Sequence, residues 1–447
     1  MSTDKSRLFY VYRIALVASV GGFLFGFDLV IISGALLYLE QYFNLSPSMK
    51  GFVVSSAILG AISGPLIGLW VTDRLGRRRT MMLATAFFAI STLGCAVTDD
   101  VWSLCFWRFM GGIGVGLAMM SSPIYIAELA PPEQRGRLVN VNQLSNVFGI
   151  NMAVIVSYFF SFEGNWRLMF ASQGVPVLIL FIGLLLIPES PRWLMLNGFA
   201  EQAKKILIRV NGPETGMKEL KEIENSLVQT QSRENLFTPP FRTALITGTL
   251  LMILSQVNGV NMMLLYAPTI LSEAGIGLGT HAILSSIPIY LFIFICTLIA
   301  FPLIKHFSRR GLLIGSVIAM GAGHVLMALI LMADLPPLYI LIPMLVATGA
   351  FTLGLAPLSW IIISELFPNR IRGRAMGIVC FFLYLSSFLI AQIFPVLGDW
   401  FAEQFENPGG MYLLFTAICW GGALFCWKMI PETKNLKLED VDHVWAK

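Results

Sequence analysis

Charged residues are scarce in this chain. Of its 447 residues, 13% are Asp, Glu, Lys or Arg, whereas 56% are hydrophobic. A soluble protein carries roughly 25% charged residues, so this balance excludes a soluble enzyme. The formal net charge of +4 is too small, and its basic residues are too dispersed, for nucleic-acid binding. The partner that this composition predicts is a lipid bilayer.

The usual motifs of catalysis are also missing. The sequence contains no GxxxxGK[ST] nucleotide loop, no catalytic triad and no zinc motif. Its six cysteines all fall within apolar stretches, where we expect small packing residues and not disulfides or metal ligands. Glycines such as Gly111 and Gly116 are expected to let helices pack closely and not to hold a phosphate. We therefore predict no enzyme, no cofactor and no metal site.

The stretches that lack charge are long enough to cross a membrane. A helix needs about 20 apolar residues to cross the hydrocarbon core. Ten charge-free stretches of that length occur, and two more, 14–39 and 101–127, contain one charged residue each. The sequence thus predicts an all-α integral membrane protein with twelve transmembrane helices.

The basic residues indicate which side of the membrane the loops occupy. Twelve spans place both termini on one side, and 27 of the 30 Lys and Arg residues fall on that side. Loops that stay in the cytoplasm are rich in Lys and Arg. We therefore expect a multi-pass protein of the plasma membrane, the inner membrane of a bacterial cell, with both termini cytoplasmic.

A long polar segment and an internal repeat divide the chain. The segment 188–242 separates six spans from six, and its apolar spacing predicts short cytoplasmic helices. The motif at 128–137, ELAPPEQRGR, recurs at 365–374 as ELFPNRIRGR, with six of ten positions identical. Such parallel repeats predict two six-helix bundles with a substrate site near the midplane between them. The predicted parts are bundles at 1–187 and 243–430, linker helices at 188–242 and a cytoplasmic tail at 431–447.

Three ionisable residues fall inside spans. A charge at a helix centre costs roughly 2.5 to 3.5 kcal/mol, so Asp28, Arg108 and His324 are functional candidates. Burial favours a neutral acid and a nearby Arg favours the carboxylate, so Asp28 facing Arg108 suits a proton carrier. The alternative is a permanent ion pair that locks the first span to the fourth. We interpret His324 as a packing residue that is hydrogen-bonded to a carbonyl; the alternative is a proton relay.

Carboxylates and guanidiniums also gather at the cytoplasmic ends of the spans. They lie in DRLGRRR (73–79), in PESPRWL (188–194) and in the two repeated motifs. The excess of positive charge explains the Arg residues but not the acids, so we favour ion pairs that latch the two halves together when the protein faces outward. The alternative is that they only orient the spans. The candidate gate residues are Asp73, Arg77, Glu128, Arg135, Glu189, Arg192, Glu365 and Arg372.

Amides and an indole lie at membrane depth as well. Amides both donate and accept hydrogen bonds, and an indole offers a flat apolar face, which together match a neutral polyhydroxylated ligand. The alternative is that the amides join helices to one another. The residues concerned are Gln143, Gln256, Asn258, Asn261 and Trp360.

Seven motifs, taken in order, resemble the sugar porters of the major facilitator superfamily over nearly the whole chain. They are GGFLFGFD (21–28), DRLGRRR (73–79), the run 108–138, PESPRWL (188–194), QVNGVNMMLLYAP (256–268), PLSWIIISELFPNRIRGRA (357–375) and PETK (431–434). The resemblance implies alternating access, in which two halves rock about a central sugar. Proton-coupled members have an Asp in the first span and an Arg in the fourth, which Asp28 and Arg108 match. Facilitative members have a neutral residue at the Asp position, so the resemblance favours symport.

The resemblance also implies the sugar contacts, and it shows where this chain departs from them. By motif position, the contacts are Phe25, Gln143, Gln256, Asn261, Tyr266 and Trp360. Apolar or smaller residues replace polar ones at Ile150, Ser255, Ile293 and Leu383. Gln173 stands where some symporters have an acid that assists coupling, and HFSRR (306–310) is a degenerate counterpart of DRLGRRR. Because lost hydrogen-bonding groups reject the usual sugar strongly, a less hydroxylated or differently shaped substrate is predicted.

Together these features predict a secondary transporter that imports a small neutral carbohydrate or polyol together with a proton. Two alternatives stay open. A facilitative uniporter would move the same substrate without protons. A non-transporting sugar sensor usually carries a long cytoplasmic extension, whereas only 431–447 follows the last span. We expect protons and lipid as the other partners, and a monomer as the functional unit.

Overall fold

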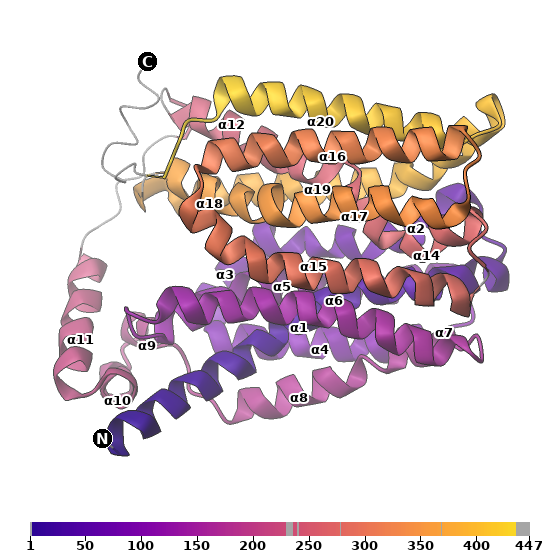
Figure 1. Ribbon diagram of the computed structural model, residues 1–447. Coiled ribbons are helices and arrows are strands. Elements are labelled where there is room, and N and C mark those ends of the chain that lie inside the picture. Colours follow the sequence, from indigo (N-terminus) through magenta and orange to yellow (C-terminus); the bar gives the residue numbers. More distant parts are fainter. Residues whose placement is uncertain (1, 229–235, 239–240, 278, 368, 435–447) are drawn as a thin grey trace. The chain divides into compact units, whose positions relative to one another are not determined.

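The computed structural model describes most of the chain as a series of helices (Figure 1). The described residues are 2–228, 236–238, 241–277, 279–367 and 369–434. They include no strand, and 12 of their helical stretches are long and apolar enough to cross a membrane. The predicted all-α fold with twelve spans is confirmed. The spans are Arg7–Phe43, Pro47–Gly68, Arg77–Val97, Val101–Leu129, Arg135–Ser161, Trp166–Leu185, Phe241–Leu265, Thr280–His306, Arg309–Met332, Pro337–Leu366, Ile371–Phe405 and Gly409–Met429.

The first six spans are built from eight α-helices and one π-helical turn. They are α1 (Ser2–Phe43), α2 (Pro47–Ala61), the π-helical turn η1 (Gly64–Gly68), α3 (Leu69–Leu75), α4 (Arg77–Val97), α5 (Val101–Leu129), α6 (Arg135–Ser161), α7 (Trp166–Ala171) and α8 (Gly174–Leu185). The predicted linker helices follow as α9 (Pro191–Leu196), α10 (Ala200–Asn211) and α11 (Pro213–Val228). Residues 229–235 and 239–240 of the linker lie outside the described residues.

The last six spans are more often interrupted. Their helices are α12 (Phe241–Val257), α13 (Val260–Leu265), α14 (Ala267–Glu273), α15 (Thr280–His306), α16 (Arg309–Met332), the 3₁₀ turn η2 (Pro337–Ile340), α17 (Leu341–Ala350), the π-helical turn η3 (Phe351–Leu355), α18 (Ala356–Leu366), α19 (Asn369–Phe405) and α20 (Gly409–Met429). Of the predicted tail, 435–447 lies outside the described residues.

Contacts between Cα atoms divide the chain into two compact units. The first unit comprises 1–29, 60–153 and 170–232, and the second comprises 30–59, 154–169 and 233–447. Both units therefore take segments from the first half of the sequence. The predicted division into six and six spans describes which parts move together, and it stays a prediction.

Small residues bring helices of the first unit into backbone contact. A Cβ atom on Gly26 of α1 would lie 2.0 Å from the carbonyl oxygen of Asn146 on α6, and one on Gly116 of α5 would lie 2.6 Å from that of Ala61. Without lipid-driven hydrophobic attraction, helices in membranes associate through such close packing. The glycines of α5 therefore pack helices, as the sequence predicted.

In the second unit, segment 30–59 packs against helices from the other end of the sequence. The Tyr290 hydroxyl on α15 donates to the carbonyl oxygen of Leu264 at 2.7 Å and lies 3.3 Å from the Ser33 hydroxyl on α1. On α19, Gln392 Nε2 donates to the carbonyl oxygen of Ser48 at 2.8 Å, and the Ser55 hydroxyl donates to Gln392 Oε1 at 3.2 Å. Polar side chains thus join α1 and α2 to α15 and α19.

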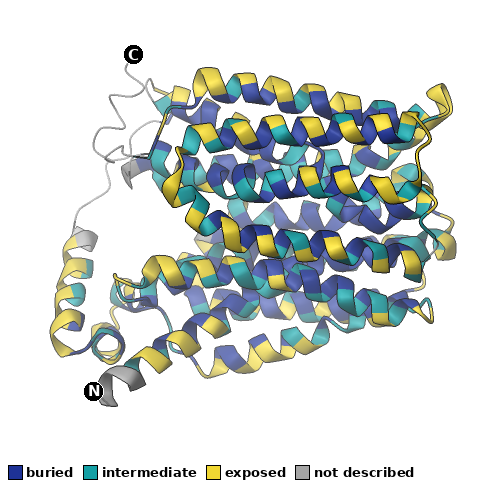
Figure 2. Cartoon of the chain, viewed as in Figure 1, coloured by how far each residue is buried: buried dark blue, intermediate teal, exposed yellow. Residues whose placement is uncertain are grey.

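The outward faces of the helices are apolar. On α8, Leu178 and Ile182 are 61% and 57% exposed, whereas Leu180 and Leu184 on the opposite face are buried. Figure 2 shows the same alternation of exposed and buried stripes along α20, where the exposed residues include Trp420 and Leu424. Exposed faces of this composition suit hydrocarbon and not water.

Substituting Gly51 should weaken the packing of α2 on α19. A Cβ atom at this position would lie 2.3 Å from the carbonyl oxygen of Gln392, and backbone cannot swing aside. We expect Gly51→Ala to cost about 1 to 3 kcal/mol, as overpacking does, and to lower the midpoint of thermal unfolding in detergent. Gly421→Ala is the matched control, because nothing lies within 4 Å of its Cβ position. An unchanged midpoint for Gly51→Ala would contradict this packing.

Candidate functional site

An acid and a base are buried together in the first unit. Asp28 on α1 is 4% exposed and Arg108 on α5 is 3% exposed. The side-chain amide of Gln173 donates from Nε2 to Asp28 Oδ1 at 3.1 Å, and the charge of Arg108 acts on the Asp28 carboxylate. The structure brings together the two residues that the sequence singled out, and it adds Gln173.

The local helix geometry explains how the three side chains meet. Gln173 lies between α7 and α8, and Phe170, one turn earlier, has its ring 5.7 Å from the guanidinium carbon of Arg108. Gly111 follows Arg108 by one turn of α5, and a Cβ atom there would lie 3.6 Å from Asp28 Oδ1 and 2.5 Å from the Ser91 hydroxyl. A glycine is therefore needed for α5 to approach Ser91 on α4, beside Asp28.

Opposed influences act on the Asp28 carboxyl. Burial favours the neutral acid, because a carboxylate loses its hydration shell, whereas Arg108 and the Gln173 amide both favour the carboxylate. A ligand or a helix movement that shields Arg108 would therefore change the proton occupancy of Asp28.

Two of the predicted sugar contacts lie in the first unit. Phe25 on α1 is partly buried and Gln143 on α6 is exposed. The neighbouring Asn142 is buried, and its Oδ1 accepts a hydrogen bond from the Ser122 hydroxyl at 2.9 Å. Asn142 thus joins helices, whereas a sugar contact by the exposed Gln143 stays a prediction.

The other four predicted sugar contacts lie in the second unit. The amides of Gln256 and Asn261 bond to each other, with Asn261 Nδ2 donating to Gln256 Oε1 at 3.0 Å, and Trp360 on α18 is 40% exposed. Tyr266 is 2% exposed, donates its hydroxyl to the carbonyl oxygen of Ala391 at 2.9 Å and stacks on Phe394. These are packing contacts, so a sugar contact by Tyr266 stays a prediction.

The positions at which this chain lacks an expected polar residue are buried or partly buried among other side chains. Ile293 and Leu383 are 5% and 7% exposed, and the Ser255 hydroxyl donates to the carbonyl oxygen of Met252 within its own helix. Ile150 on α6 is partly buried. His324 is fully buried and lies 2.7 Å from the carbonyl oxygen of Asn258, the carbonyl bond expected of it.

The predicted gate residues of the first half form a charge cluster at one end of α4. Arg77 is 7% exposed; its Nη2 donates to Glu128 Oε1 at 3.1 Å, and its Nη1 donates to Asp73 Oδ1 at 3.3 Å. Glu128 also accepts from the Ser190 hydroxyl. Glu189 Oε1 accepts from the backbone N–H of Arg78 at 3.0 Å. We name Arg77, Glu128, Glu189 and Ser190 the first charge cluster.

An equivalent cluster lies at the start of α16. Arg309 pairs with Glu365, and its Nη1 also donates to the Thr433 hydroxyl at 3.5 Å. Glu432 Oε2 accepts from the backbone N–H of Arg310 at 3.2 Å, as Glu189 does from Arg78. We name Arg309, Glu365, Glu432 and Thr433 the second charge cluster. The two arginines of HFSRR therefore make the contacts in the second half that Arg77 and Arg78 of DRLGRRR make in the first, although the two motifs share few residues.

The remaining gate candidates have other contacts. Arg372 donates from Nε and Nη2 to the carbonyl oxygen of Phe367, at 3.2 and 3.1 Å, and the ion-pair partner of Glu365 is Arg309. Arg135 lies 3.9 Å from Glu219 on the linker helix α11, and burial raises the pKa of that carboxyl while Arg135 opposes the shift. Arg192 is exposed. A latch between the halves stays a prediction, since both clusters join helices within one half.

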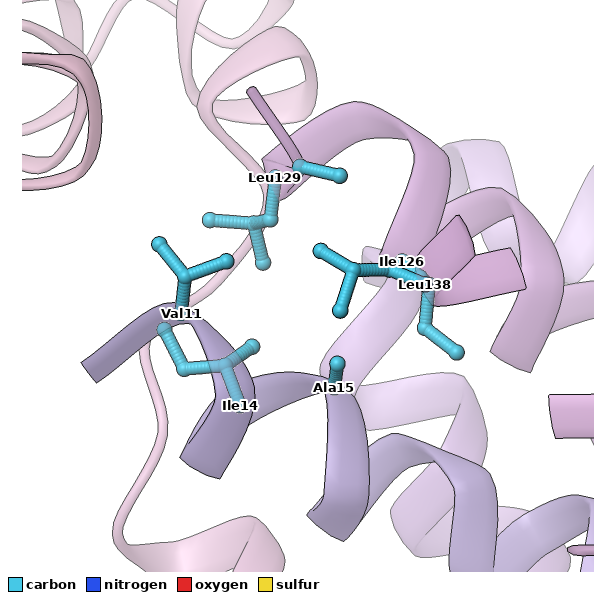
Figure 3. A pocket seen from close by; sticks show the side chains of 7 residues that line it. Val11, Ile14, Ala15, Ile126, Leu129 and Leu138 are labelled. Atoms are coloured by element: carbon cyan, nitrogen blue, oxygen red, sulfur yellow. The ribbon is translucent and has the colours of Figure 1, made fainter. Parts of the chain in front are cut away.

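Two cavities in the described residues are unsuited to a sugar. The first, of about 10 Å³, is lined by aliphatic side chains from α1, α5 and α6, among them Val11, Ile126 and Leu138 (Figure 3). It has room for about one water molecule and offers no side-chain polar group to hold one. The second, of about 380 Å³, is an apolar groove between α16 and α20, which lie side by side in Figure 1. Both are packing features.

Sequence reasoning missed Gln173 as a partner of Asp28, and it missed Arg309 and Glu432. A signal for the last two was present. PESP (188–191) and PETK (431–434) share Pro and Glu, and each follows the last span of its half. Pairing the two motifs as a second repeat would have placed Glu432 where Glu189 is in the first half.

Known proteins are similar to this chain over nearly its whole length. The family described as "Sugar (and other) transporter" matches residues 14–445. The arabinose-proton symporter of Bacillus subtilis (strain 168) is 37% identical over 457 residues, which cover 100% of this chain and 97% of that protein. The D-xylose-proton symporter of Escherichia coli (strain K12) is 34% identical, with 98% and 96% covered. The major myo-inositol transporter IolT of Bacillus subtilis (strain 168) is 30% identical, with 99% and 96% covered.

Solved structures are similar over the same length. The inward open conformation of the xylose transporter XylE from E. coli superposes with a TM-score of 0.87 and 33% identity, covering 98% of this chain and 100% of that one. The same proton:xylose symporter bound to 6-bromo-6-deoxy-D-glucose gives a TM-score of 0.79, with 98% and 99% covered.

Removing Arg77, the buried cation of the first charge cluster, should destabilise the fold more than removing the charge of its exposed partner Asp73. Arg77→Met leaves Glu128, whose side chain is 11% exposed, without its cation, and loss of one member of a buried pair costs about 3 to 5 kcal/mol. Asp73 is 68% exposed, so Asp73→Asn should cost less than about 1 kcal/mol. Thermal unfolding of both variants in detergent measures the difference. Equal midpoints would show that the Arg77–Glu128 pair contributes no more than a surface pair.

Proposed function

This chain belongs to the family of sugar and other transporters within the major facilitator superfamily, and on that premise we propose that it imports a neutral sugar or polyol together with a proton. The observation that carries the proposal is the buried group of Asp28, Arg108 and Gln173. A carrier that only lowered the barrier for a neutral solute would not need an acid there, and burying one is costly. Named relatives that are proton symporters support the same reading.

The proton step is proposed as follows. Asp28 takes up a proton when the site opens to the outside, and the neutral acid then no longer neutralises the charge of Arg108. Return of the empty carrier then requires release of the proton, because the ionised Asp28 and Arg108 neutralise each other. One proton driven by about 100 mV supplies about 2.3 kcal/mol. At about 1.4 kcal/mol per factor of ten, that supports roughly 50-fold accumulation.

The substrate is proposed to bind between the two six-helix bundles, 1–187 and 243–430. Relatives that carry arabinose, xylose and myo-inositol in their names support a pentose or a cyclic polyol. In this chain the hydrogen bonds would come from the amides of Gln143, Gln256 and Asn261, and a stacking face from Trp360. Phe25 and Tyr266 would shape the site.

The charge clusters are proposed to act at the cytoplasmic ends of the bundles, with both termini in the cytoplasm and a monomer as the transporting unit. The excess of basic residues on that side supports the orientation. In the outward-facing state the clusters would come together and latch the bundles, and they would separate when the carrier opens inward.

Asp28→Asn tests the coupling. An amide cannot carry the proton, so proteoliposomes with an imposed proton gradient should no longer concentrate substrate, while exchange of labelled for unlabelled substrate should continue. Asp334→Asn is the control, because Asp334 is exposed and its φ of 50° suits Asn equally well. Continued accumulation by Asp28→Asn would remove Asp28 from the coupling step. Wild-type protein that equilibrates substrate without alkalinising the outside would be a uniporter.

The missing polar groups give a prediction for substrate preference. A thermal-shift screen of pentoses, hexoses, deoxysugars and inositols should favour a ligand with fewer hydroxyls than glucose. Restoring one group with Ile150→Gln should strengthen glucose binding about fivefold, since one net hydrogen bond contributes about 1 kcal/mol. Ile150→Leu keeps the volume without the amide and should have no such effect. Strong glucose binding by the wild type would contradict the role given to Ile150.

A further inference from the structure

The seventh span is broken at a defined point. Helix α12 ends at Val257 and α13 begins at Val260, so Asn258 and Gly259 separate them. Gly259 has a φ of 86°, which only glycine adopts without strain, and a Cβ atom there would lie 2.7 Å from the ring of Phe415. Both the backbone conformation and the neighbouring ring therefore require glycine at this break.

Backbone groups freed by the break need partners, because hydrocarbon supplies none. The Asn258 side chain provides most of them. Its Nδ2 donates to the carbonyl oxygens of Leu254 and Ser255, at 3.0 and 2.7 Å, and its Oδ1 accepts from the backbone N–H of Val260 at 2.9 Å. The carbonyl oxygen of Asn258 itself accepts from two other helices, from the imidazole of His324 on α16 and, at 3.7 Å, from the thiol of Cys419 on α20.

His324 makes the shorter of these two hydrogen bonds. Its Nε2 lies 2.7 Å from the Asn258 carbonyl oxygen, so Nε2 carries the proton and donates it. Nδ1 is buried and has no hydrogen-bond partner among the described residues, so a second proton there would be an unpaired donor. The ring packs against Tyr412 and Phe415, with centroids 6.2 and 5.7 Å away. The imidazole is thus neutral, in one tautomer and one orientation.

The break that His324 holds also sets the spacing of two amides. Gln256 and Asn261 are five residues apart, and in an unbroken helix of about 100° per residue they would point about 140° away from each other. Across the break, Asn261 Nδ2 instead donates to Gln256 Oε1 at 3.0 Å. The two amides can therefore act on one ligand only while the break keeps its shape.

We propose that His324 is a positioning residue for the substrate site. It donates to the Asn258 carbonyl, fixes the angle between α12 and α13, and so holds Gln256 and Asn261 together for a neutral hydroxylated ligand. This inference rests on the proposed function, since it takes those two amides as ligand groups. His324 itself does not touch the substrate and carries no proton during transport.

Two variants separate the hydrogen bond from the packing. His324→Phe keeps a flat ring between Tyr412 and Phe415 but has no donor, whereas His324→Gln keeps an N–H donor at similar reach. We expect substrate binding about tenfold weaker in His324→Phe, the loss of one buried hydrogen bond, with the maximal transport rate within twofold of wild type. His324→Gln should recover most of the affinity. His306→Phe is the control, since this exposed histidine bonds only to a carbonyl of its own helix.

A double-mutant cycle distinguishes a positioning role of His324 from a merely structural one. It compares the effect of His324→Phe on substrate binding in two mutant backgrounds. If His324 acts through the amide pair, His324→Phe should weaken binding little further in an Asn261→Ala background, but should keep its full effect in an Asp28→Asn background. Equal effects in both backgrounds, or an unchanged dissociation constant in folded His324→Phe, would overturn the inference. Should His324→Phe not fold, His324→Met enters the same cycle. Wild-type protein that binds none of the sugars or polyols would instead refute the proposed function.

Discussion

Hydrocarbon solvates neither a charge nor a free peptide group, and every distinctive feature of this chain is a response to that constraint. Within the described membrane spans, charges lie near the ends, except for Asp28 and Arg108, which are buried within α1 and α5 and held with the amide of Gln173. The broken backbone at Asn258 obeys the same rule, because side chains replace the hydrogen bonds that an intact helix would have made. The places where the constraint is met with difficulty are therefore the places where function is expected.

The two halves of the chain are more alike in their contacts than in their sequences. Both halves place an Arg at the start of a span, a Glu at the end of the next span, and a Pro-Glu motif after the last span, and both connect them in the same way. In the second half the Arg stands in HFSRR and the motif is PETK, so few letters match those of the first half. Shared geometry here depends on one carboxylate accepting from a helix N-terminus and another pairing with a guanidinium, and not on the residues between them.

The spans could be predicted because absence of charge over about 20 residues has one explanation. Asp28 and Arg108 could be predicted for the same reason, since each is alone in an apolar run. Contacts that depend on helix rotation could not. Arg372 and Arg309 are equally basic, yet only the packing of α16 beside α18 selects Arg309 as the ion-pair partner of Glu365. Likewise, the sequence does not show that the Tyr266 hydroxyl donates to the carbonyl oxygen of Ala391, or that the Gln173 amide donates to Asp28.

The break between α12 and α13 is shaped from outside its own helix, by a ring 66 residues further along the chain. Two separate stretches of the gene therefore determine the geometry of a single pair of amides. A substitution in α16, or in the aromatic residues of α20 that hold the imidazole, can alter the distance between those amides without replacing either of them. Substrate range can thus drift by small steps taken at a distance, while the residues that meet the ligand keep their identity.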